Sequence, residues 1–405
     1  MFNKKIIITL FSFILFTACG SVQNVSQGDT NPDTDIAANI ITSYLFATDF
    51  ASSGQLMKAN SNVEAINNTG ITGLGSSAII RSFDGLLYVL HDGFSVASYD
   101  NVQVIDPSKG FITTKQFSTG VGTNPNDIVV VGNKAFITLY SPDRNAKVVN
   151  EDAQPIDLLV IDLTNGSQVK GISFADYLNI DDSLNARAGQ MVLNGNKIYV
   201  CLQDLDGDSF THNAPGKIAV INVNTLAIEQ VFTLKGRNPV DIALANNTLF
   251  IALQAPYDFA LGDFDTANNF GGLEILPLAG GESILLADED LGGYIERVAV
   301  SDNQVFGVAS QFDTTSFEYN STIFTLPFTA ASINDVSTFI DNSADIRDMA
   351  VNGNNQLWVA RREIKSGEGS ASKPQVDVFN AETGVQIGSS LIPPVPVTSI
   401  TFTTN

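Results

Sequence analysis

The sequence has few of the side chains that build metal centres and nucleophilic active sites. Its 405 residues contain only two cysteines, Cys19 and Cys201, and two histidines, His91 and His212. Two histidines are too few for a zinc site built on histidine ligands, and nothing supports a Ser-His-Asp triad. Cys201 lies in the apolar stretch KIYVCLQ, which predicts a small buried hydrophobe. No glycine motif for phosphates or dinucleotides stands in a meaningful context.

Basic residues are also scarce. The chain has 21 Lys and Arg against 43 Asp and Glu, which gives a formal net charge of -22 at pH 7. Nucleic acids and anionic lipid headgroups repel such a surface, so the body of the protein is not expected to bind either. The acidic excess is typical of a solvated, exported surface and could attract cations.

Long hydrophobic runs are missing except at the N-terminus. The run from Ile6 to Phe16 follows Lys4 and Lys5 and is too short to span a bilayer. Its composition predicts a secretory signal over residues 1–18. The end FTAC resembles the bacterial lipoprotein box, with Phe16 where leucine is usual, and this resemblance implies cleavage before a lipidated Cys19.

The residues after Cys19 are polar and free of aromatics, so we expect a flexible tether over residues 19–40. The membrane is then a partner through the lipid anchor. Gly20 is not the Asp that commonly retains such lipoproteins at the inner membrane, so the same resemblance favours the outer membrane. The side of that membrane on which the protein lies stays open.

The rest of the sequence is repetitive. Short β-rich runs such as KAFITL and TLFIAL recur at intervals of roughly 50 residues, and each carries an aromatic: Tyr88, Phe136, Tyr199, Phe250, Phe306 and Trp358. A second run closed by turn residues follows each of them, as in LLVIDLTNG and IAVINVNTL. Four short strands per period are typical of a β-propeller blade.

The two ends of residues 41–405 supply one more blade. VTSITF at Val397–Phe402 is a first strand without a second, while residues 42–66 contain three runs that lack a first strand. Joining them predicts an all-β, seven-bladed β-propeller closed by its terminal strands, without exposed sheet edges at the seam. A pair of β-sandwiches is the alternative, but it does not explain the repeated aromatic.

Connection lengths differ between the two faces of such a propeller. The turns at Gly132, Gly195 and Asn246 are short, whereas Ser141–Pro155, Gln203–Gly216, Gln254–Gly272, Ser310–Ser321 and Arg362–Pro374 are long. In an up-and-down blade these long connections all lie on one face, and loops of that length are usually functional or disordered. We therefore expect function on this face.

Polar residues recur where each innermost strand begins on the same face. The repeats align Ser77, Asp127, Gln190, Asp241, Arg297, Asp348 and Ser399 around the channel mouth. One interpretation is that each caps its own loop. The other is a ligand or metal site on the axis, formed by Asp127, Gln190, Asp241, Arg297 and Asp348.

Two further features of the long loops bear on function. DLDGD places Asp204, Asp206 and Asp208 at alternate positions, like the first half of a calcium loop, but Pro215 stands where the bidentate Glu would be. A divalent cation, calcium, is therefore a weakly supported cofactor. The loop aromatics could pack the loops together or form an apolar floor: Phe210, Tyr257, Phe259, Phe264, Phe270, Phe312, Phe317 and Tyr319.

The stretches NPNDIVVVGNKAFITLY, RNPVDIALANNTLFIAL and IAVINVNTLAIEQVFTL resemble the YVTN-type repeats of the YncE-like propeller proteins. The resemblance covers nearly all of the chain after the tether and implies an exported propeller. It says little about activity, because propellers host binding modules, hydrolases and dehydrogenases. Lipoprotein propellers that capture cobalamin beside an outer-membrane transporter are one model within that group, although nothing here indicates a corrinoid.

Two functions are consistent with the sequence. The first is a non-enzymatic binding protein that captures a small molecule or a protein on the long-loop side. The second is a lactonase-type hydrolase in which an axial divalent cation polarises a carbonyl. The scarcity of histidine and the variability of the polar ring favour binding.

Overall fold

The structure is a computed structural model, and it describes most of the chain from residue 41 onward. The described residues are 41–49, 53–59, 63–92, 100–141, 150, 152–179, 186–205, 214–254, 257–258, 263–264, 270–313, 318–343, 345–362 and 373–404. Apart from short helical turns, they are strands and loops.

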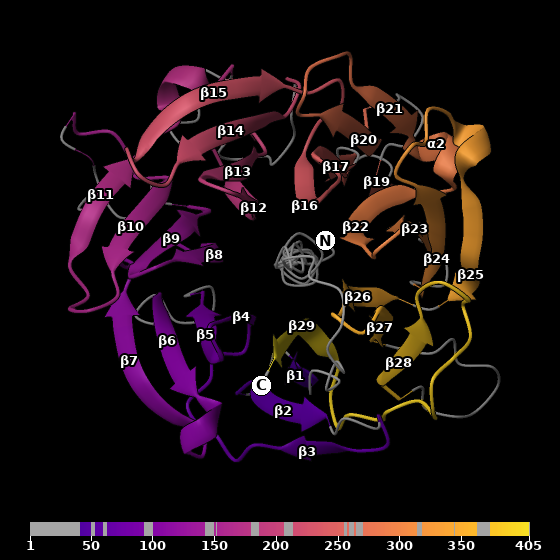
Figure 1. Cartoon of the computed structure of the whole chain (residues 1–405), viewed down its shortest axis with the longest axis horizontal. Coiled ribbons are helices and arrows are strands. Elements are labelled where there is room, and N and C mark those ends of the chain that lie inside the picture. Colours follow the sequence, from indigo (N-terminus) through magenta and orange to yellow (C-terminus); the bar gives the residue numbers. More distant parts are fainter. Residues whose placement is uncertain are drawn as a thin grey trace, which may run out of the picture.

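Seven sheets surround a central axis in the order of the sequence (Figure 1). We name each blade by its innermost strand. The β4 blade has β4 (Ala78–Phe83), β5 (Leu86–His91), β6 (Asn101–Asp106) and β7 (Ile112–Ser118). The β8 blade has β8 (Pro125–Val131), β9 (Lys134–Leu139), β10 (Leu158–Asp162) and β11 (Gln168–Ile172). The β12 blade has β12 (Ala188–Asn194), β13 (Lys197–Leu202), β14 (Lys217–Asn222) and β15 (Ala227–Thr233).

The remaining blades repeat this order. The β16 blade has β16 (Pro239–Ala245), β17 (Thr248–Leu253), β20 (Gly272–Pro277) and β21 (Ile284–Ala287). The β22 blade has β22 (Tyr294–Val300), β23 (Gln304–Asp313), β24 (Glu318–Pro327) and β25 (Ser337–Ser343). The β26 blade has β26 (Ile346–Val351), β27 (Gln356–Arg361) and β28 (Gln375–Asn380). Small elements lie in connections: η1 (Pro107–Lys109), η3 (Ala175–Tyr177), α2 (Asp288–Leu291), η5 (Ile333–Asp335), and the pair β18 (Tyr257–Asp258) and β19 (Asp263–Phe264).

The closing blade joins the two ends of the propeller, as the sequence predicts. Its order is β29 (Val397–Thr404), β1 (Ile41–Ala47), β2 (Gln55–Ala59) and β3 (Ile66–Asn68). β29 and β1 pair antiparallel from Ile41 opposite Thr404 to Ala47 opposite Val397. The seven-bladed β-propeller closed by its terminal strands is therefore confirmed.

The β26 blade departs from the four-stranded pattern. Its outer edge is covered by an irregular stretch, which touches β28 through isolated bridges of Leu391 with Val376 and of Gln386 with Phe379. The main chain of Leu391 exchanges two hydrogen bonds with Val376, so part of the edge is still paired.

Turn residues explain why the first two strands of a blade pair so tightly. β16 and β17 are joined by Asn246 and Asn247, with φ of 47° and 57°. A two-residue hairpin turn of this hand needs left-handed backbone at both central positions, which Asn tolerates better than most residues.

The repeated aromatic lies in the packing between blades. Phe136, Phe250 and Phe306 are completely buried on the second strands of their blades. Tyr44 on β1 holds the seventh such position, because it pairs with Thr401 of β29 as Phe136 pairs with Val129 of β8. The aromatic repeat therefore runs around the whole ring.

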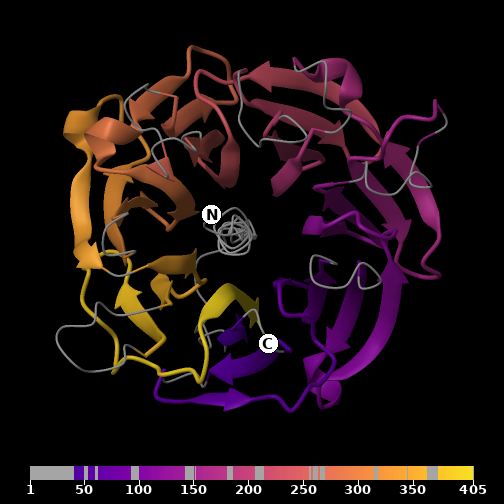
Figure 2. The ribbon, with the colours of Figure 1, turned by 180° about the vertical axis from the view of Figure 1, so that it is seen from behind.

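The two faces of the ring differ in their connections (Figures 1 and 2). We call the long-loop face the one where innermost strands begin and where second strands connect to third strands. The connection from β9 to β10 runs from residue 139 to 158, whereas β8 and β9 are joined across residues 131 to 134. The opposite face, with the turns between first and second and between third and fourth strands, is the short-turn face.

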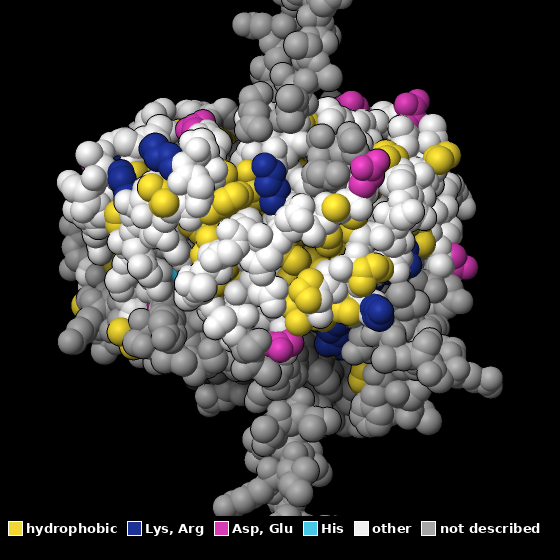
Figure 3. Space-filling model, turned by 90° about the horizontal axis from the view of Figure 1, so that it is seen from below, with side chains coloured by type: hydrophobic (Ala, Val, Ile, Leu, Met, Phe, Trp, Pro, Cys, Tyr) yellow, Lys and Arg dark blue, Asp and Glu magenta, His cyan; other side chains and the backbone are white. Residues whose placement is uncertain are grey.

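The outer wall of the ring is not uniformly polar. Figure 3 shows hydrophobic side chains gathered on the side of the ring that carries the closing blade. Exposed hydrophobic residues include Ile392, 52% exposed, and Val385, 64% exposed, in the irregular stretch of the β26 blade. No helix among the described residues is long and apolar enough to cross a membrane.

Candidate functional site: the axial polar ring and the long-loop face

Equivalent ring positions can be assigned from strand pairing. Asp127 lies two residues before Val129, the β-sheet partner of the repeated aromatic Phe136. The same rule selects Gln190, Asp241, Arg297, Asp348 and Ser399 on the other innermost strands.

The rule corrects one sequence alignment. In the β4 blade the aromatic Tyr88 pairs with Arg81, so the ring position is Ile79 and not Ser77. Ser77 precedes β4 and donates a hydrogen bond to Asp92. The nine-residue spacing from Asp127 to Phe136 recurs from Ile79 to Tyr88, so the choice of Ser77 followed its polarity and not this spacing.

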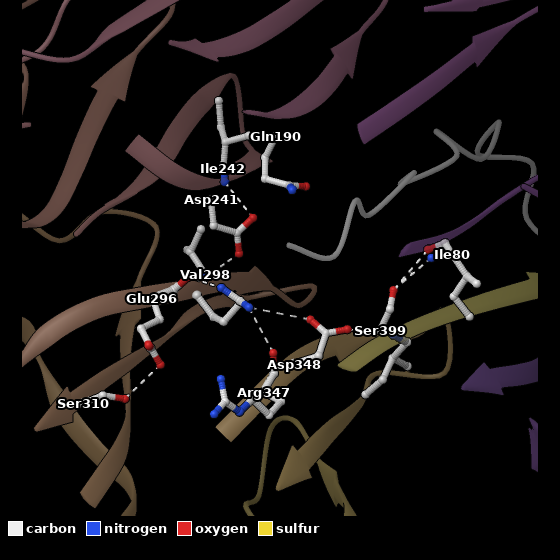
Figure 4. Close-up of polar contacts among 12 residues, drawn as sticks. Ile80, Gln190, Asp241, Ile242, Glu296, Val298, Ser310, Arg347, Asp348 and Ser399 are labelled. Carbon is white, nitrogen blue, oxygen red and sulfur yellow. Dashed lines mark hydrogen bonds and ion pairs between the residues drawn. The ribbon is translucent and has the colours of Figure 1, made fainter. Parts of the chain in front are cut away.

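The ring side chains bind the next blade. The Oδ2 atom of Asp127 accepts a hydrogen bond from the main-chain N–H of Met191 at 2.9 Å. Asp241 accepts from Val298 at 3.0 Å and Asp348 from Ile400 at 2.7 Å. The hydroxyl oxygen of Ser399 accepts from Ile80 at 3.2 Å. Figure 4 shows the links of Asp241 with Val298 and of Ser399 with Ile80 around the axis. Each ties one innermost strand to the following one.

Arg81 completes the ring on the side of the β4 blade. Its Nε lies 2.8 Å from Oδ1 of Asp127, and one terminal nitrogen donates to Oε1 of Gln190 at 2.8 Å. Gln190 in turn donates to Asn126 at 3.1 Å. Sequence reasoning missed Arg81, although a charged residue within the apolar strand AIIRSF was a visible signal.

Arg297 has a similar role on the opposite side of the ring. It donates to the carbonyl oxygens of Glu296 at 2.7 Å and Arg347 at 3.0 Å. Its Nε lies 3.8 Å from Oδ1 of Asp348 (Figure 4). The ring therefore contains two buried arginines that offset part of the charge of three buried aspartates.

Burial controls the protonation of these carboxyl groups. It raises the pKa of Asp241 to about 7, although Arg297 and two main-chain N–H groups act in the opposite direction. Burial also raises the pKa of Asp348 to about 6, although the charge of Arg297 acts in the opposite direction. The pKa of Asp127 is also raised by burial, with Arg81 opposing the shift. Asp241 therefore changes its charge close to neutral pH.

Asp204 lies in a separate cluster below the long loops. It is fully buried, and its Oδ2 atom lies 2.5 Å from Nζ of Lys217 and accepts from the N–H of Asn179 at 3.0 Å. A cation at Asp204 would have to displace this ammonium group. Asp206 and Asp208 lie outside the described residues. Among the residues that are described, no three or more His, Cys, Asp or Glu side chains group as metal ligands.

A second polar cluster supports the long-loop face between the β22 and β26 blades. Oδ2 of Asp345 lies 2.6 Å from Arg347 and 2.9 Å from Arg362. Both guanidinium groups lie over the ring of Tyr319, at 5.7 and 5.8 Å from its centroid. Burial raises the pKa of Tyr319 to about 12, so its hydroxyl stays protonated.

Three of the loop aromatics are described in full and pack against protein groups. Phe312 and Tyr319 face each other on β23 and β24 with ring centroids 4.8 Å apart. The guanidinium of Arg237 lies 3.6 Å from the centroid of Phe270. Loop packing is therefore what these three residues do. The side chains of Phe210, Tyr257, Phe259, Phe264 and Phe317 lie outside the described set.

The chemistry of the ring follows from these contacts. Its carboxylates already hold main-chain N–H groups and arginines, and each polar residue of the ring is at most 3% exposed. A ligand at the axis would have to exchange these bonds for its own. The role of Asp127, Gln190, Asp241, Arg297 and Asp348 in ligand binding stays a prediction.

Comparisons with known proteins identify the fold. No protein-family model matches the sequence, and no curated protein is detectably similar to it in sequence. Among solved structures, a candidate 6-phosphogluconolactonase from Bacteroides fragilis is similar, with a TM-score of 0.57 and 11% identity over 92% of this chain and 100% of that one. A second, from Bacteroides uniformis, has a TM-score of 0.56 and 11% identity over 90% and 99%.

A protein of different function is also similar. Hydrazine synthase from Kuenenia stuttgartiensis has a TM-score of 0.50 and 13% identity over 84% of this chain and 96% of that one. At such identities the likeness concerns the fold alone, and one fold hosts unrelated activities. The class defined by fold and comparison is therefore the β-propeller.

Proposed function

We propose that the chain is an exported, lipid-anchored β-propeller that binds a small molecule or a protein on its long-loop face. Cys19 carries the anchor, and the outer membrane is the favoured location. The signal-like residues 1–18 and the polar stretch to residue 40 support export and tethering. The resemblance to YncE-like proteins belongs to the same proposal.

The proposed binding function rests on the unequal lengths of the connections on the two faces. β13 and β14 are separated by residues 203–216, β17 and β20 by residues 254–271, and β27 and β28 by residues 362–374. On the same face β1 and β2 are joined across residues 47 to 55 and β23 and β24 across residues 313 to 318, so a blade closes without such insertions. Extra chain that folding does not require, and that gathers on one face, is best explained by recognition.

The base of this face is rigid enough to hold a binding surface. Asp345 fixes Arg347 and Arg362, and the two arginines enclose Tyr319. Side chains locked by such contacts hold the strand ends that border the long connections in a defined position, which lowers the entropic cost of binding there.

Lactonase-type hydrolysis is less well supported. It needs carboxylates that can turn toward a divalent cation. Asp127, Asp241 and Asp348 instead each hold a main-chain N–H of the next blade, and two of them also face an arginine. Recruiting them to a metal would break the links between blades.

Photo-crosslinking tests the proposed face. A photoreactive phenylalanine derivative replaces Tyr177, 39% exposed in η3 on the long-loop face, or Ile112, 49% exposed where β7 begins on the short-turn face. The full chain is irradiated in cell envelopes, and adducts are identified by mass spectrometry. We expect adducts from position 177 and few from position 112.

Adducts mainly from position 112 would contradict the proposal, because they would place binding on the short-turn face. Hydrolysis of a lactone by the purified chain, lost on chelation and restored by a divalent cation, would support the hydrolase instead.

A further inference from the structure

The direction of β1 fixes where the chain enters the propeller. Every innermost strand begins on the long-loop face and ends on the short-turn face, and β29 is the innermost strand of its blade. β1 runs antiparallel to β29, with Ile41 opposite Thr404 at the end of β29. Ile41 therefore lies on the short-turn face, and Ala47, opposite Val397, lies on the long-loop face.

We infer that the residues preceding Ile41 join the propeller on the short-turn face, so that the anchored protein turns its long-loop face away from the membrane. The partner of that face is then a water-soluble molecule that arrives from the aqueous phase, and not a lipid of the anchoring membrane. This inference rests on the proposed function, because it takes Cys19 as the anchor.

The length of the stretch between Cys19 and Ile41 favours this orientation. It spans at most about 75 Å when fully extended and about 25 Å on average as a flexible coil. An innermost strand such as β22 alone is about 23 Å long. Turning the long-loop face to the membrane would require the stretch to run back past the whole ring, which takes nearly all of its average length as a coil and about a third of its fully extended length.

Charge on the short-turn face has a further consequence. Its turns expose Asp84, Asp302 and Glu382, and the chain carries a net charge of -22. Anionic headgroups repel such a surface, so the face itself does not adhere to the membrane. The lipid anchor alone would hold the protein, and water would separate the propeller from the bilayer.

Two labels that flank one strand test the orientation. Asp290 and Asp302 are both exposed aspartates, and they lie just before and just after β22, on the long-loop and short-turn faces respectively. Asp290→Cys and Asp302→Cys therefore make a matched pair. Cys201 is fully buried and does not compete for the dye.

The full lipidated chain is labelled with a donor dye and reconstituted in phosphatidylcholine vesicles that carry an acceptor on a fraction of the headgroups. We expect energy transfer roughly two-fold greater or more from Asp302→Cys than from Asp290→Cys, because β22 separates the labels by about 23 Å. In a chain that begins at residue 20, and so lacks both Cys19 and the apolar signal segment, both signals should vanish.

Each other outcome overturns the inference in a distinguishable way. Equal or reversed transfer from the two labels would contradict the orientation and leave the anchor intact. Absence of transfer from both labels would contradict the anchor and, with it, the orientation. Transfer that persists in the chain that begins at residue 20 would mean that the propeller itself contacts the lipid.

Discussion

Single residues of the axial ring explain how neighbouring blades are held together. Asp127 connects three blades, because it accepts from Met191 of the β12 blade and pairs with Arg81 of the β4 blade. Arg81 and Asp127 are 1% and 0% exposed. Removing one partner of a buried ion pair leaves the other charge without compensation, which is far costlier than losing a surface pair.

Asp127→Ala should therefore lower the free energy of unfolding by about 3–5 kcal/mol. Denaturant unfolding measures the change. Replacing Arg81 by Met in the same chain should recover much of the loss, because no unpaired guanidinium remains. If the double variant is as unstable as the sum of the single variants, the two groups are not coupled.

Asp241 should make stability depend on pH near neutrality. Its folded pKa of about 7 lies above the ordinary value, so the native state retains a proton that the unfolded chain releases. This contribution to stability is fully present below about pH 4 and is lost as the pH rises through 7. The side chain of the variant Asp241→Asn cannot ionise, so the stability of the variant does not lose this contribution as the pH rises.

The stability difference between the native chain and Asp241→Asn should therefore shift in favour of the variant by about 1 kcal/mol or more between pH 5 and pH 8. Chemical unfolding at the two pH values gives the comparison, and taking the difference cancels other titrating groups. A stability difference between the two chains that is independent of pH would mean that Asp241 is ionised in the folded protein throughout this range.

At the scale of elements, closure of the ring depends on the closing blade. β29 and β1 are far apart in the sequence, and their pairing is the only hydrogen-bonded ladder among the described strands that joins the two ends of the chain. The N–H of Thr48 also donates to the carbonyl of Pro396 at 2.8 Å. Ser399 and Ile400 connect β29 to the blades on its two sides.

Deleting residues 397–405 should open the ring. The buried residues Leu45, Met57 and Trp358 would lose the cover that β29 provides, so the melting temperature should fall steeply and the transition should broaden. Differential scanning calorimetry measures both effects. A milder deletion of residues 403–405 removes only the last pairs with Ile41 and Thr42 and should cost much less. Unchanged cooperative unfolding of the longer deletion would contradict closure by β29.

At the scale of the whole molecule, the two faces of the propeller carry different parts of the chain. The chain enters beside the short turns, and the long connections lie on the opposite side. A ring of small sheets suits this separation, because a blade can carry a long connection between its second and third strands, as between β13 and β14, without changing its core. The predicted long connection Ser310–Ser321 is different, because β23 and β24 extend through most of it and are joined across residues 313 to 318.

The proposed anchor can be tested on the whole protein. Cys19→Ala should leave the signal segment uncleaved and prevent incorporation of labelled fatty acid, because the thiol is the site of lipid attachment. Fractionation of cell envelopes, with Cys201→Ala as the matched control, measures the result. If Cys19→Ala fractionates like the native chain, the protein reaches its location by another route.

Much of this architecture was predictable because it repeats. The aromatic at Phe136, Phe250 or Trp358, the hairpin turns and the unpaired terminal runs each indicated the propeller, and every level of pattern agreed. The irregular fourth strand of the β26 blade was not predictable, because Gln386 and Leu391 pair across a bend that no alternation of residues signals.

The candidate site was predictable in position but not in its contacts. Local repeats located Asp127, Asp241 and Asp348 at equivalent places on innermost strands. They could not reveal the contacts of Arg81, whose partners are 46 and 109 positions away in the sequence.

The sequence by itself determined the class of fold, because strand periodicity and turn chemistry are local properties that each period of the chain repeats. Only the tertiary structure decided which residues meet across the axis, which aspartates are desolvated, and on which face Ile41 enters. These properties depend on bringing distant strands together, and a strand pattern carries no record of the partner that will lie beside it.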